Sequence, residues 1–447
     1  MKALPPKYVE RMKSLLGEEY PLYERTFSEP SARGLQINTH KISPSDFDAL
    51  FSLPTEPLSY AEGGRRLLSD VKVGADPMHA AGLYYMQDPG AMSAVAALPS
   101  VGGRVLDVAA APGGKTIAAA LRAPSAFVVA NEVNFSRAKI LMQNVERLGL
   151  RNVAVTSLSP SDLGKYAEGM FDLVIADLPC SGEGMFRKED AAVEAWNENI
   201  TAMNASRQRE ILEGVLPALR EGGTLLYSTC TYSLEEDEEI VRYLIEEKGM
   251  TLLEPREAVR SVTANGISVG GLDLTRARRF YPFLAAGEGQ FFAILGKGGE
   301  PRPHTARAVP PKISVGESKR IRAFTDRYLT GDLGVITRQG DAYYAVSPLA
   351  RTLPLRYLSE GVRIGEFAGD KFIPHHNLFT AFGDFFRNRE DLPFADPRLA
   401  AYLHGEEIEA KQASDGYVCV TVEGYPLGGG NAVGGRIKNR YPKGLRI

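Results

Sequence analysis

Two cysteines in this sequence occupy positions from which thiols could carry out covalent chemistry. Cys180 ends the apolar run FDLVIADLPC, and Cys230 ends the apolar run GGTLLYSTC. If both runs are consecutive strands of one parallel sheet, the two thiols lie side by side at its carboxyl edge, where such sheets bind ligands. A buried cysteine is more often a small hydrophobic residue, but two at equivalent strand ends favour a reactive site. Asp177, on the same loop as Cys180, adds a carboxylate.

The stretch VLDVAAAPGGKT (105–116) predicts a strand, a loop of small residues and the start of a helix. Such a loop lets the backbone approach a ligand closely. It matches neither G-x-x-x-x-G-K-[ST] nor G-x-G-x-x-G, so a tight turn of an ordinary α/β fold stays an alternative. Glu132 follows the next strand, 25 residues beyond Asp107. An acidic residue there commonly binds the ribose hydroxyls of a nucleoside cofactor, although it could also be an exposed helix cap.

A loop for a nucleoside cofactor, two thiols and a carboxylate together are typical of one reaction. Carbon 5 of cytosine or uracil is a poor nucleophile in the intact aromatic ring. Addition of a thiolate at carbon 6 makes an enamine, whose carbon 5 can attack an electrophilic methyl group, and this is covalent catalysis. An acid must then hydrogen-bond the ring at N3, and a base must remove the proton from carbon 5. A second thiol has a place in that elimination.

The residues after Cys230 predict the start of a helix. Ser233 and Glu236 have the spacing of a capping box, so we expect both to be structural. A helix that begins there would also favour a thiolate at Cys230.

From about residue 101, short apolar runs alternate with helical patterns, which predicts a doubly wound, mostly parallel sheet. The preceding run LYYMQDPGAMSAVAAL (83–98) is apolar with helical character. We expect a small α/β domain over 1–75, a catalytic domain over 76–297, a linker rich in Gly and Pro over 298–312, and a C-terminal region over 313–447 that divides into 313–372 and 373–447.

The composition bounds the class of protein. The 447 residues predict more than one domain, and 44% hydrophobic with 24% charged residues are globular values. The three cysteines are too few for a disulfide framework. The chain contains no apolar run of the roughly 18 residues that a membrane span needs, and MKALPPKYVERMK lacks the apolar region of a secretory signal. We therefore expect a cytoplasmic enzyme that does not bind membranes. The net charge of −3 does not decide for or against nucleic acid.

Three motifs carry a resemblance to a known family. DVAAAPGGKT, ADLPCSGEGMFRK and YSTCTYSLEEDE are similar to the Nol/Nop/Sun family of RNA (cytosine-5) methyltransferases. The segments GLQINTHK and YYMQDPGAMS resemble it too, and the ending GGRIKNRYPKGLR is similar to the RsmF-type ribosomal RNA methyltransferases within it. The resemblance implies a Rossmann-like class I methyltransferase core with a small N-terminal α/β domain and a C-terminal α+β RNA-binding extension.

The resemblance also implies S-adenosylmethionine as the methyl donor and a role for each site residue. Cys230 would attack carbon 6, Cys180 would assist product release, and Asp177 would contact the cytosine and lie near the donor. Glu132 would hold the ribose, and Lys115 would reach toward the target base. The donor would border Ala109, Ala110, Ala111, Pro112, Gly113, Gly114 and Lys115. Ser159 stands where relatives often carry an acidic residue for the adenine, which leaves open whether Asp162 or backbone takes its place.

The flanking regions favour RNA as the partner. Residues 297–327 hold eight Lys or Arg against three Asp or Glu, and the last twenty residues hold five basic and no acidic ones. Basic residues among Tyr and Phe suit phosphate contact and base stacking, although a solvated basic tail is the alternative. A cytosine in folded RNA must also be flipped or presented in a loop, and the flanking domains could hold the RNA for that step.

Several functions stay open. The C-terminal extension favours ribosomal RNA, either naked or within the small ribosomal subunit, over transfer RNA, which is the first alternative. A non-catalytic ribosome-assembly factor is the second, and two thiols in one crevice argue against it. DNA cytosine methylation is less favoured because it needs no second thiol in a Thr-Cys motif. We expect a monomer.

Overall fold

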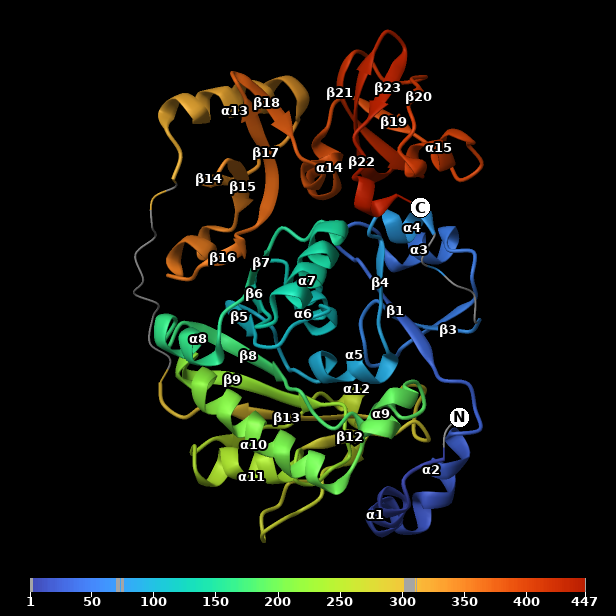
Figure 1. The fold of residues 1–447 in the computed structure, drawn as a ribbon, viewed down its shortest axis with the longest axis vertical. Coiled ribbons are helices and arrows are strands. Elements are labelled where there is room, and N and C mark those ends of the chain that lie inside the picture. Colours follow the sequence, from blue (N-terminus) through green and yellow to red (C-terminus); the bar gives the residue numbers. More distant parts are fainter. Residues whose placement is uncertain (1–2, 70–72, 74–75, 301–309, 311, 447) are drawn as a thin grey trace.

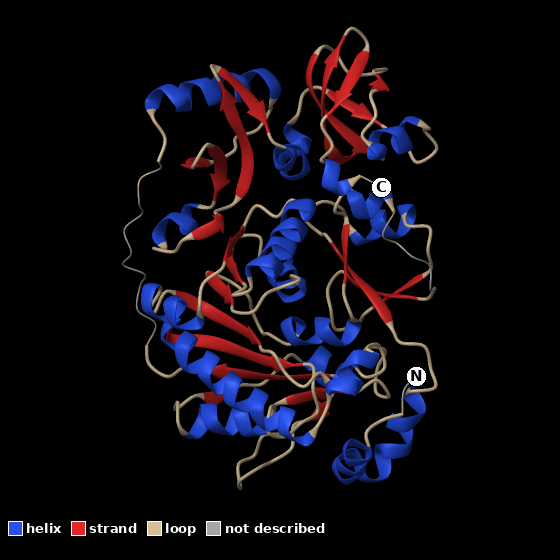
Figure 2. Ribbon diagram, in the orientation of Figure 1, coloured by secondary structure: helices blue, strands red, loops and turns tan. Residues whose placement is uncertain are grey.

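The computed structural model describes residues 3–69, 73, 76–300, 310 and 312–446 (Figures 1 and 2). Five parallel strands form its centre: β5 (Arg104–Asp107), β6 (Phe127–Asn131), β7 (Val153–Thr156), β8 (Phe171–Asp177) and β9 (Leu219–Thr229). Their spatial order is β9-β8-β5-β6-β7, so the chain order reverses between β5 and β8. This confirms the doubly wound sheet expected from the sequence.

Antiparallel strands extend the sheet beyond β9. β13 (Gln290–Gly296) pairs with β9, and β12 (Arg278–Phe280) with β13. β11 (Ala264–Asn265) pairs with β12, and β10 (Thr251–Leu252) with the end of β13. These additions leave the carboxyl ends of the parallel strands free to hold loops.

Helices cover both faces of the central sheet. One face carries α5 (Pro89–Ala96), α6 (Gly114–Arg122), α7 (Phe135–Leu148) and α12 (Glu257–Arg260). The opposite face carries α8 (Pro160–Tyr166), α10 (Glu198–Val215) and α11 (Glu238–Glu246). The strands are therefore buried on both sides, which is why they read as continuous apolar runs without polar alternation. All five residues of β6, for example, are buried.

The ends of α7 show how local sequence sets an element. Asn134 accepts hydrogen bonds from the backbone N–H groups of Ser136 and Arg137, as an N-cap does. Gly149 ends the helix in the left-handed conformation, with φ 67°, a conformation that glycine adopts without steric cost.

The N-terminal part begins with two helices and continues as an antiparallel sheet, with two more helices between its strands. Its helices are α1 (Pro6–Leu16), α2 (Tyr20–Thr26), α3 (Pro44–Leu50) and α4 (Pro77–Ala80). Its strands, β1 (Arg33–Ile37), β2 (Thr55–Pro57), β3 (Gly64–Leu67) and β4 (Tyr84–Met86), lie in the order β2-β3-β1-β4. The sheet thus runs past the boundary expected at residue 75. The helical character expected over 83–98 is wrong for its first part, because Tyr84–Met86 pair with β1 and the helix begins only at Pro89.

The C-terminal region holds two further sheets. The first contains β14 (Val335–Gln339), β15 (Ala342–Val346), β17 (Val362–Ala368) and β18 (Lys371–Pro374), with α13 (Val315–Tyr328) beside it. The second contains β19 (Arg389–Asp391), β20 (Ile408–Glu409), β21 (Gly416–Val422), β22 (Tyr425–Val433) and β23 (Arg436–Asn439), with α15 (Arg398–His404). Between them lies α14 (His376–Phe382). Most of the expected linker, 298–312, lies outside the described residues.

Both ends of the chain pack together and against the central domain. Leu35, Phe47 and Tyr84 share a hydrophobic core with Tyr402 and Val418, although hundreds of residues separate them. Figure 1 shows the red C-terminal sheet next to the blue helices α3 and α4. β16 (Tyr357–Ser359) returns from the C-terminal region to pair with β7 at the edge of the central sheet. The flanking regions are thereby fixed on the catalytic core.

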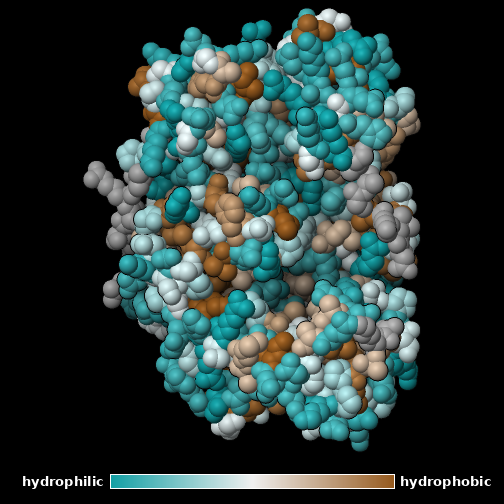
Figure 3. Space-filling model, in the orientation of Figure 1, coloured by the Kyte–Doolittle hydropathy of each residue, from teal (hydrophilic) through white to brown (hydrophobic). Residues whose placement is uncertain are grey.

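The face of the molecule drawn in Figure 3 is mostly polar. Its apolar residues lie in scattered patches. No helix among the described residues has the length and apolar character required to cross a bilayer.

Candidate active site

Two loops at the carboxyl edge of the sheet carry the cysteines. β8 and β9 are neighbouring parallel strands, with Asp177 opposite Ser228. The Cys180 loop (residues 178–183) follows β8, and the Cys230 loop (residues 230–237) follows β9. The two sulfur atoms lie 3.3 Å apart, which confirms that the thiols are neighbours at this edge.

The two thiols differ in their surroundings. The hydrogen bond with the Cys230 sulfur, and then burial of the thiol, raise the pKa of Cys180 well above its usual range. Cys180 is therefore held as a thiol that can donate to the Cys230 sulfur. Cys230 lines the cavity described below, whereas Cys180 is not among its lining residues. Both cysteines are partly exposed, and Cys230 is the one that faces this cavity.

Asp177 and Lys115 form an ion pair next to the cysteines. The Lys115 Nζ atom lies 2.8 Å from Asp177 Oδ2, and Ser228 donates a hydrogen bond of 2.7 Å to Asp177 Oδ1. Lys115 is in the first turn of α6 and is 7% exposed, while Asp177 is the last residue of β8. The pair offers both a cation and an acceptor at one point of the cavity wall.

A cavity of about 370 Å³ opens beside this pair. It is lined by the expected residues Ala109, Ala110, Ala111, Pro112, Gly114, Lys115, Asp177 and Cys230. Tyr85, Met86, Gln87, Asp88, Ala91, Asp107, Met185, Glu189, Gly289 and Gln290 complete the lining. The loop after β5, the strand β4 and the segment before β13 thus meet at one place.

The wall of the cavity contains acceptors that a ligand could satisfy. The buried Oδ1 of Asp107 and the buried Oε1 of Gln87 have no hydrogen-bond partner within the described part of the chain. Burial raises the pKa of Asp107 to about 7, against the hydrogen bond that Thr116 donates to it. Gly114 lies so close to Gln87 that a Cβ there would be 2.8 Å from the amide nitrogen. Two unpaired acceptors over a glycine loop fit a ligand that carries an ammonium group and hydroxyls.

Three expected site residues do not line the cavity. Gly113 is the N-cap of α6 with φ 126°. The Glu132 side chain is buried, accepts a hydrogen bond of 2.9 Å from Asn134 N and lies 3.2 Å from Arg137 Nη1. Apart from that ion pair, the buried Oε2 of Glu132 has no hydrogen-bond partner within the described part of the chain, so it is an acceptor that a ribose hydroxyl could reach. Cys180 contacts the Cys230 sulfur without lining the cavity itself.

Ser159, where the sequence lacks the acidic adenine contact, has a structural partner. Its hydroxyl accepts a hydrogen bond of 3.1 Å from Asp162 N and donates one of 2.8 Å to the Asp162 carboxylate. Ser159 and Asp162 therefore form the start of α8.

The expected capping box after Cys230 is wrong. The helix α11 begins only at Glu238, and its N-cap Asp237 makes no side-chain capping bond. Glu236 instead accepts hydrogen bonds from Ser181 on the other loop, while Ser233 donates to Glu235. The helix start is thus too far along the chain to explain a thiolate at Cys230.

The sequence did not single out Gln87, Asp107 or Gln290 as site residues. Gln87 lies within the motif YYMQDPGAMS, and Asp107 ends the strand before the glycine loop. These positions in the sequence could have identified both as site residues. Gln290 has no comparable signal, because it reaches the site through the antiparallel strand β13.

Fold and site together define the class. A sheet whose order reverses between β5 and β8, with a glycine loop and a ligand cavity at that reversal, is a Rossmann-like methyltransferase core. Family models agree: residues 94–296 match 16S rRNA methyltransferase RsmB/F, residues 4–89 the N-terminal domain of 16S rRNA methyltransferase RsmF, and residues 389–447 the methyltransferase RsmF PUA domain.

Curated relatives match nearly the whole chain. A protein of Klebsiella pneumoniae named ribosomal RNA small subunit methyltransferase F is 32% identical over 93% of this chain and 90% of its own. The protein of the same name in Erwinia tasmaniensis is 30% identical over 99% of this chain and 96% of its own. The chain therefore belongs to the RsmB/F family of 16S rRNA methyltransferases.

Solved structures are similar over about two thirds of this chain. A methyltransferase homolog from Pyrococcus horikoshii has a TM-score of 0.55 and 26% identity, over 66% of this chain and all of that one. NSun6 from the same organism has a TM-score of 0.55 at 22% identity, over 66% and 99%, and shows the fold alone. The family consists of S-adenosylmethionine-dependent enzymes that methylate carbon 5 of cytosine in ribosomal RNA, which confirms the fold class, enzyme class and cofactor expected from the sequence.

Proposed function

We propose that this protein methylates carbon 5 of cytosine in small-subunit ribosomal RNA through a covalent intermediate on Cys230. The observation that carries the proposal is the contact of the two sulfurs at 3.3 Å, beside a Lys115–Asp177 pair on the wall of one cavity. A purely RNA-binding protein would need none of these groups in that arrangement.

Covalent addition is the first step. The Cys230 thiolate adds to carbon 6 of cytosine, which moves an electron pair to carbon 5 and makes an enamine. S-adenosylmethionine, when bound against residues 109–115 and Asp107, supplies an electrophilic methyl group to carbon 5. A base then removes the proton from carbon 5, its electron pair forms the double bond between carbons 5 and 6, and the carbon–sulfur bond breaks to release the Cys230 thiolate.

Lys115 and Asp177 orient the cytosine. The cation and the acceptor lie at the cavity wall within reach of the ring in which charge develops, and a preorganised pair stabilises such charge without rearrangement. Asp177 contacts the base on the side of N3, and Lys115 holds the Asp177 side chain in place. Glu132 binds the donor ribose after exchanging its contact with Arg137.

Cys180 assists the elimination. The Cys180 thiol, whose pKa is held well above its usual range, lies in hydrogen-bond contact with the nucleophile's sulfur. A hydrogen bond from that thiol would stabilise the thiolate that forms at Cys230 as the carbon–sulfur bond breaks.

The N-terminal and C-terminal regions bind the RNA, and the substrate is RNA within the small ribosomal subunit. The protein acts as a monomer in the cytoplasm, where its three free cysteines stay reduced.

The test is transfer of labelled methyl groups to three RNAs. Small ribosomal subunits, naked 16S rRNA and transfer RNA are incubated with labelled S-adenosylmethionine and either the wild type or Cys230→Ala. We expect 5-methylcytosine in ribosomal RNA with the wild type alone. Label confined to transfer RNA would contradict the substrate, and label that survives Cys230→Ala would contradict the mechanism.

A further inference from the structure

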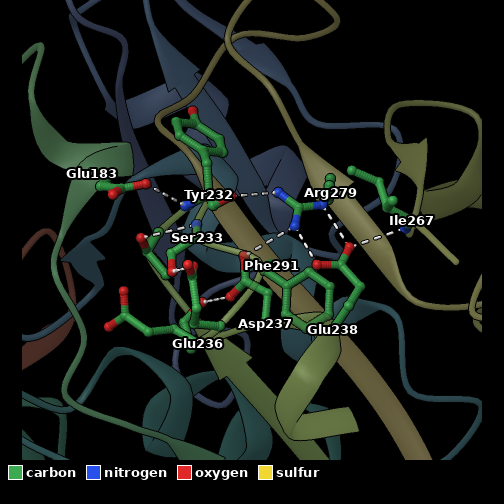
Figure 4. Close-up of polar contacts among 12 residues, drawn as sticks. Glu183, Tyr232, Ser233, Glu236, Asp237, Glu238, Ile267, Arg279 and Phe291 are labelled. Atoms are coloured by element: carbon green, nitrogen blue, oxygen red, sulfur yellow. Dashed lines mark hydrogen bonds and ion pairs between the residues drawn. The ribbon is translucent and has the colours of Figure 1, made fainter. Parts of the chain in front are cut away.

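Each cysteine loop carries a buried carboxylate that accepts hydrogen bonds from the other loop. Glu183, on the Cys180 loop, accepts a hydrogen bond of 3.3 Å from the backbone N–H of Tyr232 on the Cys230 loop. Glu236, on the Cys230 loop, accepts hydrogen bonds from Ser181 N at 2.8 Å and Ser181 Oγ at 2.6 Å. Figure 4 shows Glu183 directed at the backbone of Tyr232. Each loop is therefore held by a carboxylate of the other loop.

Two more bonds connect the residues next to the cysteines. The hydroxyls of Ser181 and Thr231, which directly follow Cys180 and Cys230, lie 2.7 Å apart. The N–H of Gly184 donates to the carbonyl of Cys230 at 2.9 Å. The distance between the sulfurs is therefore set by contacts between the loops, and the carboxylates hold most of these contacts.

The Cys230 loop is also fixed on its far side. Thr229 donates a hydrogen bond of 2.5 Å to Asp237, and Arg279 donates one of 3.1 Å to the carbonyl of Tyr232 (Figure 4). Arg279 pairs with Glu238 and lies 3.5 Å from Asp237 Oδ2. Because the Cys230 loop is fixed at that end, the distance between the two sulfurs depends on the position of the Cys180 loop. Glu183 and Glu236 hold that loop in position.

Burial of these two carboxylates costs folding free energy. Both side chains are fully buried, or nearly so. Arg11 of α1 and the indole N–H of Trp196 satisfy Glu183, whereas no lysine or arginine of the described ranges pairs with Glu236. Burial accordingly raises the pKa of Glu236 to about 7. An apolar residue would serve packing better, so the carboxylate indicates a need for its hydrogen bonds.

We propose that Glu183 and Glu236 are positioning residues that hold the Cys180 and Cys230 sulfurs in contact. This inference rests on the proposed function for its effect on turnover but makes a separate statement about geometry. Loss of the Glu236 carboxylate lets the Cys180 loop move away from Cys230. Misplacement of a reacting group by about 1 Å costs up to about 100-fold in rate, so turnover falls while the binding of donor and RNA is kept.

The experiment measures the geometry and the turnover of the full-length protein separately. Diamide oxidises two neighbouring thiols to a disulfide and is itself reduced to a hydrazine, so its rate with Cys180 and Cys230 reports how well the sulfurs are placed. Disulfide formation is followed by the loss of alkylation at these two residues in peptide mass spectra. Methyl transfer to 16S rRNA gives kcat and KM for the same variants.

Four variants and a control separate positioning from folding. Glu236→Ala and Glu183→Ala remove the carboxylates, Ser181→Ala removes one donor, and Glu236→Gln keeps the size and an acceptor. Glu239→Ala is the matched control, because Glu239 lies on the same segment but pairs with Arg242 at the surface. Midpoints of urea unfolding are recorded for all five.

We expect Glu236→Ala to slow both disulfide formation and kcat by at least about 10-fold with KM within about twofold. Glu183→Ala should do the same, Ser181→Ala should do so more weakly, Glu236→Gln should restore most of the rate, and Glu239→Ala should match the wild type. Unchanged disulfide formation in Glu236→Ala and Ser181→Ala overturns the inference, whatever happens to kcat. Should Glu236→Ala not fold, Ser181→Ala and Glu236→Gln decide. Activity that survives Cys230→Ala would instead count against the proposed function alone.

Discussion

Lys115 Nζ lies 2.8 Å from Asp177 Oδ2, on the wall of the cavity that Cys230 also lines. Lys115 lies at the start of α6, after the loop that follows β5, and Asp177 ends β8; these two strands flank the point where the order of the sheet reverses. The fold thus delivers a cation, an acceptor and a thiol to one place. The predictions below start from this relationship.

Removing the Asp177 charge should slow methyl transfer without abolishing donor binding. Asp177→Asn keeps the side-chain size but loses the ion pair, so we expect kcat to fall by about 100-fold or more. Single-turnover methylation of 16S rRNA and calorimetric titration with S-adenosylmethionine measure the two effects. A donor affinity that falls as steeply as kcat would show that Asp177 serves the donor rather than the cytosine.

Gln87 and Asp107 should bind the donor. Each has a buried oxygen without a hydrogen-bond partner in the described structure, and both line the cavity. Gln87→Met and Asp107→Asn should each weaken S-adenosylmethionine binding by about 10-fold, since each removes a hydrogen bond to a buried ligand. Calorimetry measures this, and an unchanged Kd for both variants would remove these residues from the donor site.

The pH dependence of stability should report Glu236. Its pKa in the folded protein is about 7, above the ordinary value of 4.5, so the folded state retains a proton that the unfolded state has lost. Stability from this group is full below about pH 4.5 and is lost as the pH rises through 7. The advantage of Glu236→Gln over the wild type should therefore grow from about pH 5 to 7 and level off above about pH 8.

Urea unfolding of both proteins across this range measures that difference. Comparing two variants cancels the contributions of Asp107 and Glu288, whose pKa values burial also raises to about 7. A difference that does not depend on pH would show that Glu236 is ionised in the folded protein throughout.

Much of the fold and the pair of thiols could be predicted because they depend on local sequence. The apolar runs ending at Asp177 and Thr229 identify buried parallel strands, and such strands place their ends at one edge. The neighbourhood of Cys180 and Cys230 follows from that alone. The two ends of α7 are likewise determined by local residues, because Asn134 caps its start and Gly149 ends it.

Contacts between segments far apart in the chain could not be predicted from the sequence. Glu236 has the spacing of a helix cap, but its carboxylate binds Ser181, 55 residues away in the chain, because the strand pairing brings that N–H group closer than the helix start. The sequence around Tyr84 and Tyr85 predicts a helix, but in the structure these residues pair with β1 as part of a strand. The core shared by the two ends of the chain has no local signature either.

The basic C-terminal residues should contact RNA phosphates. Lys438 and Lys443 are exposed, and neither forms an ion pair within the part of the chain that the structure describes. Replacing both by alanine should weaken binding to 16S rRNA and lower the slope of log K against log salt by about 1 to 2. Filter binding across a salt series checks this. An unaltered slope would leave these lysines as a solvated tail.

The central claim is that Cys230 forms the bond to the base, and a trapping experiment tests it most directly. In 16S rRNA transcribed with 5-fluorocytidine, carbon 5 carries fluorine instead of the hydrogen that elimination removes, so the methylated adduct cannot be released. The wild type and Cys180→Ala should give an RNA adduct that survives denaturation and depends on S-adenosylmethionine, and peptide mapping should place it on Cys230. An adduct that persists in Cys230→Ala and disappears in Cys180→Ala would contradict the account.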